Sequence, residues 1–143
     1  MITKKAEYAI TTLTELAKLK PGEQITTREI ARRRNIPINL IVQLVSTLRD
    51  AGWVASTRGP GGGIMLACNP DHISLRQVIE LYDGPISITR CLLQDGPCHN
   101  QVECSLRGVW AEAQEKMLEV LEGVTIKKLA EADRKLRAEK AEI

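Results

Sequence analysis

Three cysteines lie close together in the second half of the chain, at positions Cys91, Cys98 and Cys104. Their spacing does not match the closely spaced cysteine pairs that are usual in a structural zinc site. Wider spacing on a loop allows the thiolates to surround a larger group, and soft thiolates favour iron-sulfur clusters. The pattern therefore indicates an iron-sulfur site, while a zinc site and a metal-free thiol switch stay open as alternatives.

The segment around these cysteines shows neither helical nor strand periodicity from Asp83 to Glu103. Gly96, Pro97 and Asn100, which lie within it, are residues typical of turns. A loop of this length inside a domain is usually functional, disordered or tied down by a ligand. We therefore expect a cysteine loop over residues 84–104 that is organised by whatever its thiols bind.

The other reactive side chains give little support for catalysis. Cys68 stands apart on a predicted strand, and we interpret it as a core residue because free cysteines are commonly buried. The chain has only two histidines, and we find no Ser/His/Asp or Cys/His arrangement that would suit a nucleophilic mechanism. We therefore do not expect an enzyme.

Composition and charge restrict the class of protein further. The chain of 143 residues has no Phe, which suits one domain of packed helices with an aliphatic core. It has no signal-peptide pattern and no run of about 20 apolar residues, so we expect a cytoplasmic protein without membrane association, where thiols stay reduced. Residues 1–60 carry ten Lys or Arg against five Asp or Glu, and we expect an anionic partner to bind there.

The first half of the chain predicts a helix-turn-helix. Residues 3–19 have apolar positions at helical spacing. Thr26-Thr27-Arg28-Glu29 has the form of a capping box at the start of a second helix, which runs to about Arg34. A turn at residues 35–37 then leads into a third, amphipathic helix that ends at about Asp50.

A hairpin and a fourth helix complete this unit. Residues 53–57 and 64–68 have the pattern of two strands around a glycine-rich turn, which is typical of a wing. Ser74 begins another capped helix. We predict a mainly α fold with a small β wing, in which residues 1–83 form a winged helix-turn-helix domain that binds DNA.

The face of the third helix opposite its leucines carries side chains that suit a DNA major groove. Gln and Asn can read adenine there, and Val can touch a thymine methyl group. An Arg at the glycine-rich tip of a wing suits a narrow minor groove, and further Arg side chains would meet phosphates. The predicted DNA-binding residues are Arg28, Asn39, Val42, Gln43, Ser46, Arg49, Arg58 and Gly59.

After the cysteine loop, residues 105–124 form a long amphipathic helix with one apolar face. The first four helices already make a closed unit, so we expect this face to pack on a second copy of the chain. The predicted dimerisation residues are Leu106, Val109, Trp110, Ala113, Met117 and Leu121. Residues 125–143 are so rich in Lys, Arg and Glu that we expect a helical tail that frays.

Taken together, these motifs resemble the Rrf2 family of bacterial winged-helix transcription regulators, from the N-terminus to about Ala130. The matching stretches are ITKKAEYAI, IPINLIVQLVSTLRDAGWV, STRGPGGGIMLA, SLRQVIELYDG, and the three cysteines followed by CSLRGVW. The resemblance implies a homodimer that crosses its long helices and binds a 2Fe-2S or 4Fe-4S cluster through the three cysteines.

The resemblance also suggests a fourth ligand. One branch of the family uses a histidine shortly after the third cysteine, where this chain has Arg107. Another branch uses an acidic residue of the first helix of the partner subunit, and the matching position here is Glu7. We therefore predict that Glu7 is the fourth ligand in trans, with His99 as the alternative.

The resulting hypothesis is a dimeric repressor whose affinity for a pseudo-palindromic operator in double-stranded DNA is controlled by an iron-sulfur cluster that senses iron, nitric oxide or redox state. A cluster-free or zinc-containing repressor is the main alternative. An iron-sulfur electron carrier is a weaker alternative, because it would have no use for a wing and a recognition helix.

Overall fold

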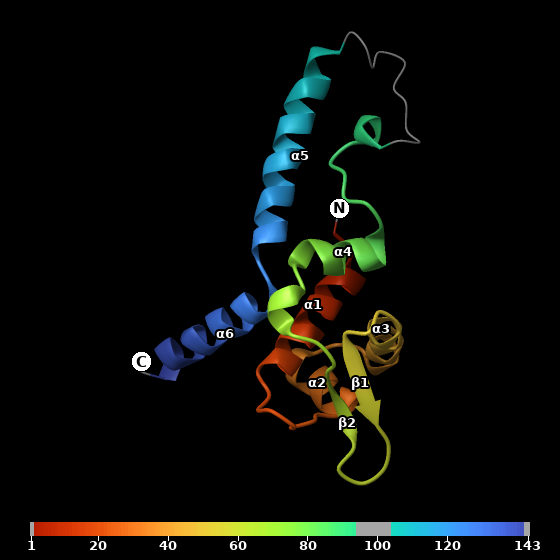
Figure 1. The fold of residues 1–143 in the computed structure, drawn as a ribbon, viewed down its shortest axis with the longest axis vertical. Helices are drawn as coiled ribbons and strands as arrows, with labels where there is room; N and C mark the ends of the chain where they lie inside the picture. The colour runs from red at the N-terminus through yellow and green to blue at the C-terminus, as the bar shows by residue number, and fades with distance from the viewer. Residues whose placement is uncertain (1, 94–103, 142–143) are drawn as a thin grey trace.

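Helices dominate the structure, a computed structural model that describes residues 2–93 and 104–141 (Figure 1). The elements in chain order are α1 (Lys4–Ala17), α2 (Thr27–Arg34), α3 (Ile38–Asp50), β1 (Val54–Thr57), β2 (Gly63–Leu66), the 3-10 turn η1 (Pro70–His72), α4 (Leu75–Asp83), the 3-10 turn η2 (Arg90–Leu92), α5 (Ser105–Gly123) and α6 (Ile126–Ala141). The mainly α fold with a small β wing is therefore confirmed.

Side chains at the helix starts explain where several of these helices begin. The Thr26 hydroxyl accepts a hydrogen bond from the Glu29 backbone amide at 3.1 Å, as predicted. The Glu29 carboxylate, however, turns to Arg32 and Arg33, so it does not complete the predicted capping box. A complete box is found at α4 instead, between Ser74 and Gln77.

The two strands of the wing pair antiparallel, from Val54 opposite Leu66 to Thr57 opposite Gly63. The segment before α2 pairs with β2 close to the hairpin turn, because the amides and carbonyls of Ile25 and Ile64 bond reciprocally at 3.1 and 2.7 Å. A Cβ atom at Gly63 would lie 2.6 Å from the Ile25 carbonyl oxygen. Only glycine therefore allows this close approach of the two backbones.

The aliphatic core lies between α1, α3, α4 and the wing, and α6 belongs to it. Ile126 is fully buried in the same cluster as Leu13 and Ile41, and Ala130, one turn further along α6, is also buried. Residues 126–141 form a continuous helix docked on α1, whereas the sequence predicts a tail that frays. The prediction missed this docking because few apolar residues of α6 face the core and they stand among many charges.

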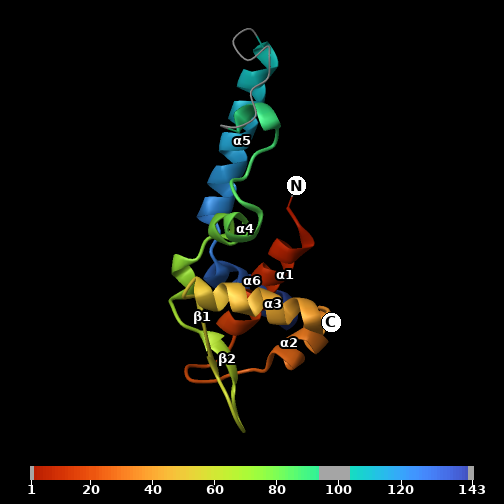
Figure 2. The same ribbon diagram turned by 90° about the vertical axis from the view of Figure 1, so that its right-hand side faces the viewer.

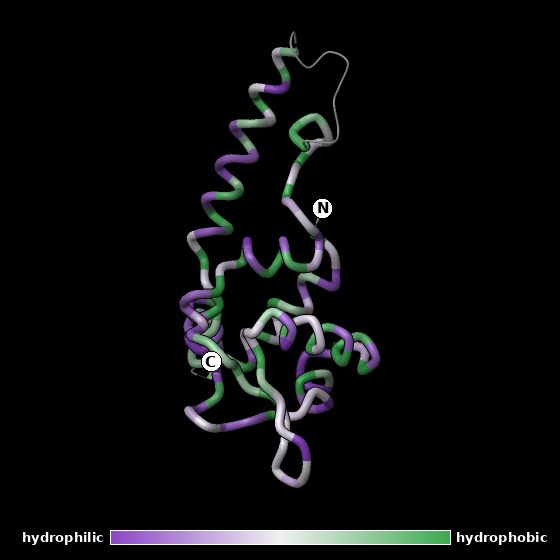
Figure 3. The backbone as a smooth tube through the Cα atoms, turned by 45° about the vertical axis from the view of Figure 1, so that its right-hand side comes forward, coloured by the Kyte–Doolittle hydropathy of each residue, from purple (hydrophilic) through white to green (hydrophobic). Residues whose placement is uncertain are grey.

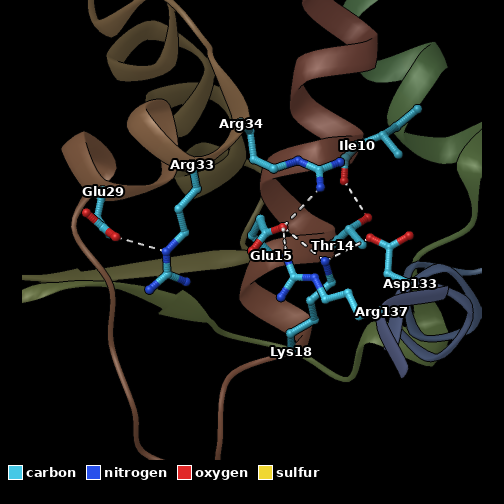
Figure 4. A network of polar contacts seen from close by, with 9 residues as sticks. All are labelled: Ile10, Thr14, Glu15, Lys18, Glu29, Arg33, Arg34, Asp133 and Arg137. Atoms are coloured by element: carbon cyan, nitrogen blue, oxygen red, sulfur yellow. Dashed lines mark hydrogen bonds and ion pairs between the residues drawn. The ribbon is translucent and has the colours of Figure 1, made fainter. Parts of the chain in front are cut away.

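A buried carboxylate fixes α6 and α2 to α1 (Figure 4). The Glu15 side chain is only 3% exposed, and its Oε1 lies 3.0 Å from Lys18 Nζ, 3.4 Å from Arg34 Nη1 and 3.7 Å from Arg137 Nη2. Lys18 also bonds Asp133 of α6 at 2.8 Å. The cluster therefore places positive charge from three helices around one buried acid.

By contrast, α5 projects away from this core (Figures 1 and 2). It contacts α4 and η2, and none of its residues is buried. The recognition helix α3 and the wing lie at the opposite end of the molecule. In the described ranges, 2–93 and 104–141, no helix has the length and apolar character needed to cross a membrane.

The docking of α6 can be tested with Ile126→Ala. The change removes a fully buried side chain, so we expect the free energy of unfolding to fall by about 2–5 kcal/mol in urea denaturation followed by circular dichroism. Leu136→Ala on the same helix is the control, because Leu136 is 59% exposed and its loss should cost less than about 0.5 kcal/mol. Equal midpoints for the two variants would contradict the docking of α6.

Candidate nucleic-acid interface and cysteine site

The recognition helix α3 has one buried face and one exposed face. Ile41, Leu44, Val45 and Leu48 are buried in the core. The predicted contact residues all lie on the exposed side, and they are Asn39, Val42, Gln43, Ser46 and Arg49. Polar groups that can bond base edges are thus presented together with an apolar side chain, Val42, that is 55% exposed.

The sequence analysis missed one residue on this face, Ile38. It is the first residue of α3, and its side chain is 48% exposed. A large apolar side chain left in solvent at the start of a recognition helix suits contact with a sugar or a thymine methyl group. Its position directly after Pro37, the N-cap of α3, was the available signal.

The wing lies beside α3, and one hydrogen bond ties the two together. Arg49 Nη1 donates to the Ser56 hydroxyl of β1 at 3.0 Å. Arg58 and Gly59 are exposed in the turn between the strands, and Gly59 has a φ of 94°, which favours glycine. Within the chain, Arg49 therefore adds one hydrogen bond to the contacts that hold the wing beside α3.

The arginines of α2 differ in how their charge is balanced. Arg32 and Arg33 both bond Glu29, at 2.6 and 2.9 Å, and Arg34 faces the buried Glu15. Hydrogen bonds from Arg32 and Arg33 lower the pKa of Glu29 to about 2, so this carboxylate stays ionised at neutral pH. Arg28 and Arg58 are exposed, and neither has an ion pair with another residue of the described ranges.

The cysteine segment leaves α4 at Gly84, whose φ of 76° is accessible mainly to glycine. It then runs along α5, where the Ile88 amide donates to Gln114 Oε1 at 3.1 Å. The turn η2 follows and contacts α5, so this part of the predicted loop has local structure after all.

Two of the three predicted thiol ligands lie in the described ranges. Cys91 is half-buried in η2, and its Sγ lies 2.8 Å from the Thr89 hydroxyl. Cys104 is half-buried and is the N-cap residue of α5. Cys98 and His99 lie outside the described residues.

The surroundings of these thiols suit a negatively charged group. The amino end of a helix carries partial positive charge, and Cys104 stands at the start of α5. Arg107 follows one turn later, and its Nε is buried without a hydrogen-bond partner among the described residues. The described residues contain no cluster of three metal-binding side chains, and Cys98, the third predicted thiol ligand, lies outside them.

Glu7 lies on the exposed side of α1, and its carboxylate pairs with Lys4 Nζ at 3.1 Å. Within the described part of one chain it joins no group of metal-binding side chains. Its predicted role as a ligand depends on a second copy of the chain, so it stays a prediction.

Cys68 lies at the edge of the core, whereas the sequence predicts that it is inside it. It is half-buried after β2 and is in contact with the hydrophobic core. This burial raises the pKa of its thiol, because the charged thiolate loses hydration.

Apolar residues recur along α5 (Figure 3), and among the described residues no side chain of this helix is buried. Leu106, Val109, Trp110 and Ala113 are exposed, while Met117 and Leu121 are half-buried. Val120, which the sequence analysis missed, is also exposed. Near the core, Met117 joins Ile2, Ile79 and Ile88 in lining a cavity of about 380 Å³.

Comparisons with known proteins agree on one class. The family model Rrf2, described as an iron-dependent transcriptional regulator, matches residues 2–132. The HTH-type transcriptional regulator IscR of Aliivibrio salmonicida is 32% identical over 128 residues, which cover 90% of this chain and 76% of that protein.

Solved structures give the same result. The structure of CymR, the global cysteine regulator of B. subtilis, is similar with a TM-score of 0.78 and 33% identity, covering 92% of this chain and 97% of that one. T. potens IscR is similar in fold, with a TM-score of 0.74 and 23% identity over 93% of this chain and 88% of that one. The relatives are transcriptional regulators and not enzymes.

The raised pKa of Cys68 can be tested by alkylation. Only the thiolate reacts, so at pH 8 we expect native Cys68 to react with iodoacetamide more slowly than the same residue in urea. Its rate should keep rising with pH beyond the ordinary thiol pKa of about 8.5. Mass spectrometry of the Cys68 peptide measures both rates, and equal rates in the two states would refute the assigned environment.

Proposed function

The chain belongs to the Rrf2 family of DNA-binding transcription regulators, and on this premise we propose that it is a repressor that binds a pseudo-palindromic operator as a homodimer. We further propose that an iron-sulfur cluster held by Cys91, Cys98 and Cys104 controls its affinity for that operator. The observation that supports DNA binding is the exposed polar face of α3, which lies beside a wing bonded to it through Arg49 and Ser56.

On DNA, α3 enters the major groove. Gln43 and Asn39 bond base edges, and Val42 contacts a thymine methyl group. Arg58 at the wing tip enters the adjacent minor groove, where negative potential is strongest if the groove is narrow. Arg28 contributes a phosphate contact, because its charge is not engaged by a described carboxylate.

Dimerisation is supported by the exposure of α5. Val109 and Leu106 are 58% and 50% exposed, and an apolar face of this length is costly in water. A second copy of the same helix covers it with a self-complementary contact. The two recognition helices then sit at a fixed separation, which matches two half-sites of a palindrome.

Cys91 lies within the cysteine segment, in η2, and Cys104 lies at its end, at the start of α5, so a group bound by both thiols would hold the segment at these two points. When bound, a cluster supplies iron-thiolate bonds that nitric oxide, oxygen or iron shortage can break. Glu7 from the second copy is the fourth ligand, with His99 as the alternative. Arg107, whose Nε is buried without a hydrogen-bond partner among the described residues, would supply positive charge near the thiolates rather than act as a ligand.

Control of DNA binding then follows from how firmly these thiols hold the segment between α4 and α5. A coupling free energy of about 1–3 kcal/mol between the site and α3 corresponds to a roughly 5- to 150-fold change in affinity. This range is sufficient for a regulator.

A second candidate is a cluster-free regulator in which the cysteines form a thiol switch or a zinc site. The observation in its favour is the 33% identity to CymR, the global cysteine regulator of B. subtilis. Metal analysis separates the two candidates.

The DNA interface can be tested with Arg58→Ala. Loss of a minor-groove cation should weaken binding roughly tenfold and lower the salt dependence by about one counterion. Fluorescence anisotropy is measured on a duplex that the wild-type protein has selected from a randomised pool. Lys127→Ala removes an exposed charge from α6, away from the wing, and should leave the affinity unchanged. A wild-type affinity for Arg58→Ala would exclude the wing from the interface.

The metal site can be tested with Cys104→Ser on protein purified without oxygen. The wild type should show broad absorbance near ~400 nm with matching iron and sulfide, and the variant should lose both. Serine is itself a good N-cap, so α5 keeps its start. Cys68→Ser is the matched control and should keep the wild-type spectrum. A colourless wild type that still binds DNA would favour the second candidate.

A further inference from the structure

Tyr82 connects the last turn of α4 to the recognition helix. Its hydroxyl donates to the backbone carbonyl of Leu44 in the middle of α3, at 2.8 Å. Among the described residues, no other side chain bonds the backbone of α3 from another helix. Leu44 directly follows Gln43, so this contact lies one residue from the predicted reading face.

The neighbouring residue, Asp83, holds a second helix. Its carboxylate accepts hydrogen bonds from the backbone amide of Thr3, at 3.0 Å, and from the Thr3 hydroxyl. Thr3 is the N-cap of α1. The end of α4 is therefore bonded both to α3 and to the start of α1.

The chain enters the cysteine segment directly after these two contacts. Gly84, with φ 76° and ψ −168°, has a conformation that is nearly restricted to glycine, and Pro85 limits the next φ. Four residues beyond Gly84, the Ile88 amide is bonded to Gln114 of α5. Pro85 and the Ile88 bond therefore restrict the segment between the end of α4 and Cys91, and Gly84 is the position at which it can turn.

We propose that Tyr82 is a positioning residue that transmits the state of the cysteine segment to the recognition helix through its hydrogen bond to Leu44. When the thiols hold the segment against α5, the last turn of α4 is fixed and the hydroxyl holds α3 in the orientation that fits DNA. When the segment is released, the last turn of α4 shifts and this restraint on α3 is lost. The inference rests on the proposed control of DNA binding by Cys91 and Cys104.

The Tyr82 hydroxyl stays protonated over the pH range in which cysteine thiols ionise. Burial raises the pKa of Tyr82 above its usual range, so the group stays a neutral donor. A carbonyl inside a helix has a second lone pair, so Leu44 can accept this bond and keep its place in the helix.

The test measures DNA affinity with and without the two cysteine thiols, which we call the two loop states, and with either Tyr or Phe at position 82. The loop states are the wild-type cysteines, in protein purified without oxygen, and the double variant Cys91→Ser/Cys104→Ser. In the Tyr82 background we expect the double variant to bind the selected duplex at least about fivefold more weakly, because the restraint on α3 is lost. In the Tyr82→Phe background this ratio should fall close to one.

Tyr8→Phe is the matched control. It removes the same hydroxyl from the other tyrosine, which lies half-buried on α1 and makes no side-chain hydrogen bond to a described residue. It should leave the ratio between the loop states unchanged. If the DNA affinities of the two loop states still differ in Tyr82→Phe, the inference about Tyr82 is wrong. If the two affinities are already equal with Tyr82 present, the proposed control by the cysteines is wrong as well.

Hydrogen exchange gives a second readout that does not depend on how Tyr82→Phe folds. With Tyr82 present, the amides of residues 41–48 should exchange faster in the double cysteine variant than in the wild type. Unchanged exchange in α3 would also overturn the inference. A loss of protection throughout the core would show general destabilisation and would likewise count against it.

Discussion

The arrangement of the DNA-binding unit depends on the burial of one carboxylate, that of Glu15. A buried charge costs several kcal/mol unless opposite charge and hydrogen bonds surround it. Its partners, Lys18, Arg34 and Arg137, come from α1, from the end of α2 and from α6. The three helices therefore have to meet at this point. Since α2 leads directly into the turn before α3, the same cluster helps to set where the recognition helix begins.

The position of α4 explains how a regulatory segment can be attached without disturbing this core. The Leu75 amide, in the first turn of α4, bonds the Val124 carbonyl at 2.9 Å, and the Ile126 amide bonds the Ile73 carbonyl at 2.9 Å. The chain thus leaves the core through α4 and returns to it beside the start of the same helix. The cysteine segment and α5 are inserted between these two points, and the backbone hydrogen bonds of Leu75 and Ile126 join the two ends of the insertion. Arg76 adds a further contact across this base, 3.8 Å from Glu122.

Much of this fold could be predicted from local patterns, because periodicity and turn chemistry act over a few residues. The buried stripe of α3 and the glycine-rich wing are examples, and so is the exposed apolar face of α5. Contacts between distant side chains could not be predicted in this way. The Glu29 carboxylate had two equally local uses, as a cap or as a partner for arginine, and sequence does not rank them. The bonds from Arg49 to Ser56 and from Tyr82 to Leu44 depend on how helices pack. Cys98 lies outside the described residues, so the ligand set stays a prediction.

The docking of α6 on α1 also has a consequence for the order in which the protein is made. Ile126 and Ala130 complete the core, yet the ribosome synthesises them after the whole of α5. The helix-turn-helix, although its residues emerge early, stays incomplete until this last helix arrives. The core under α3 therefore depends on a segment that follows α5, and a chain that stopped at Gly123 would lack the buried Ile126 from that core.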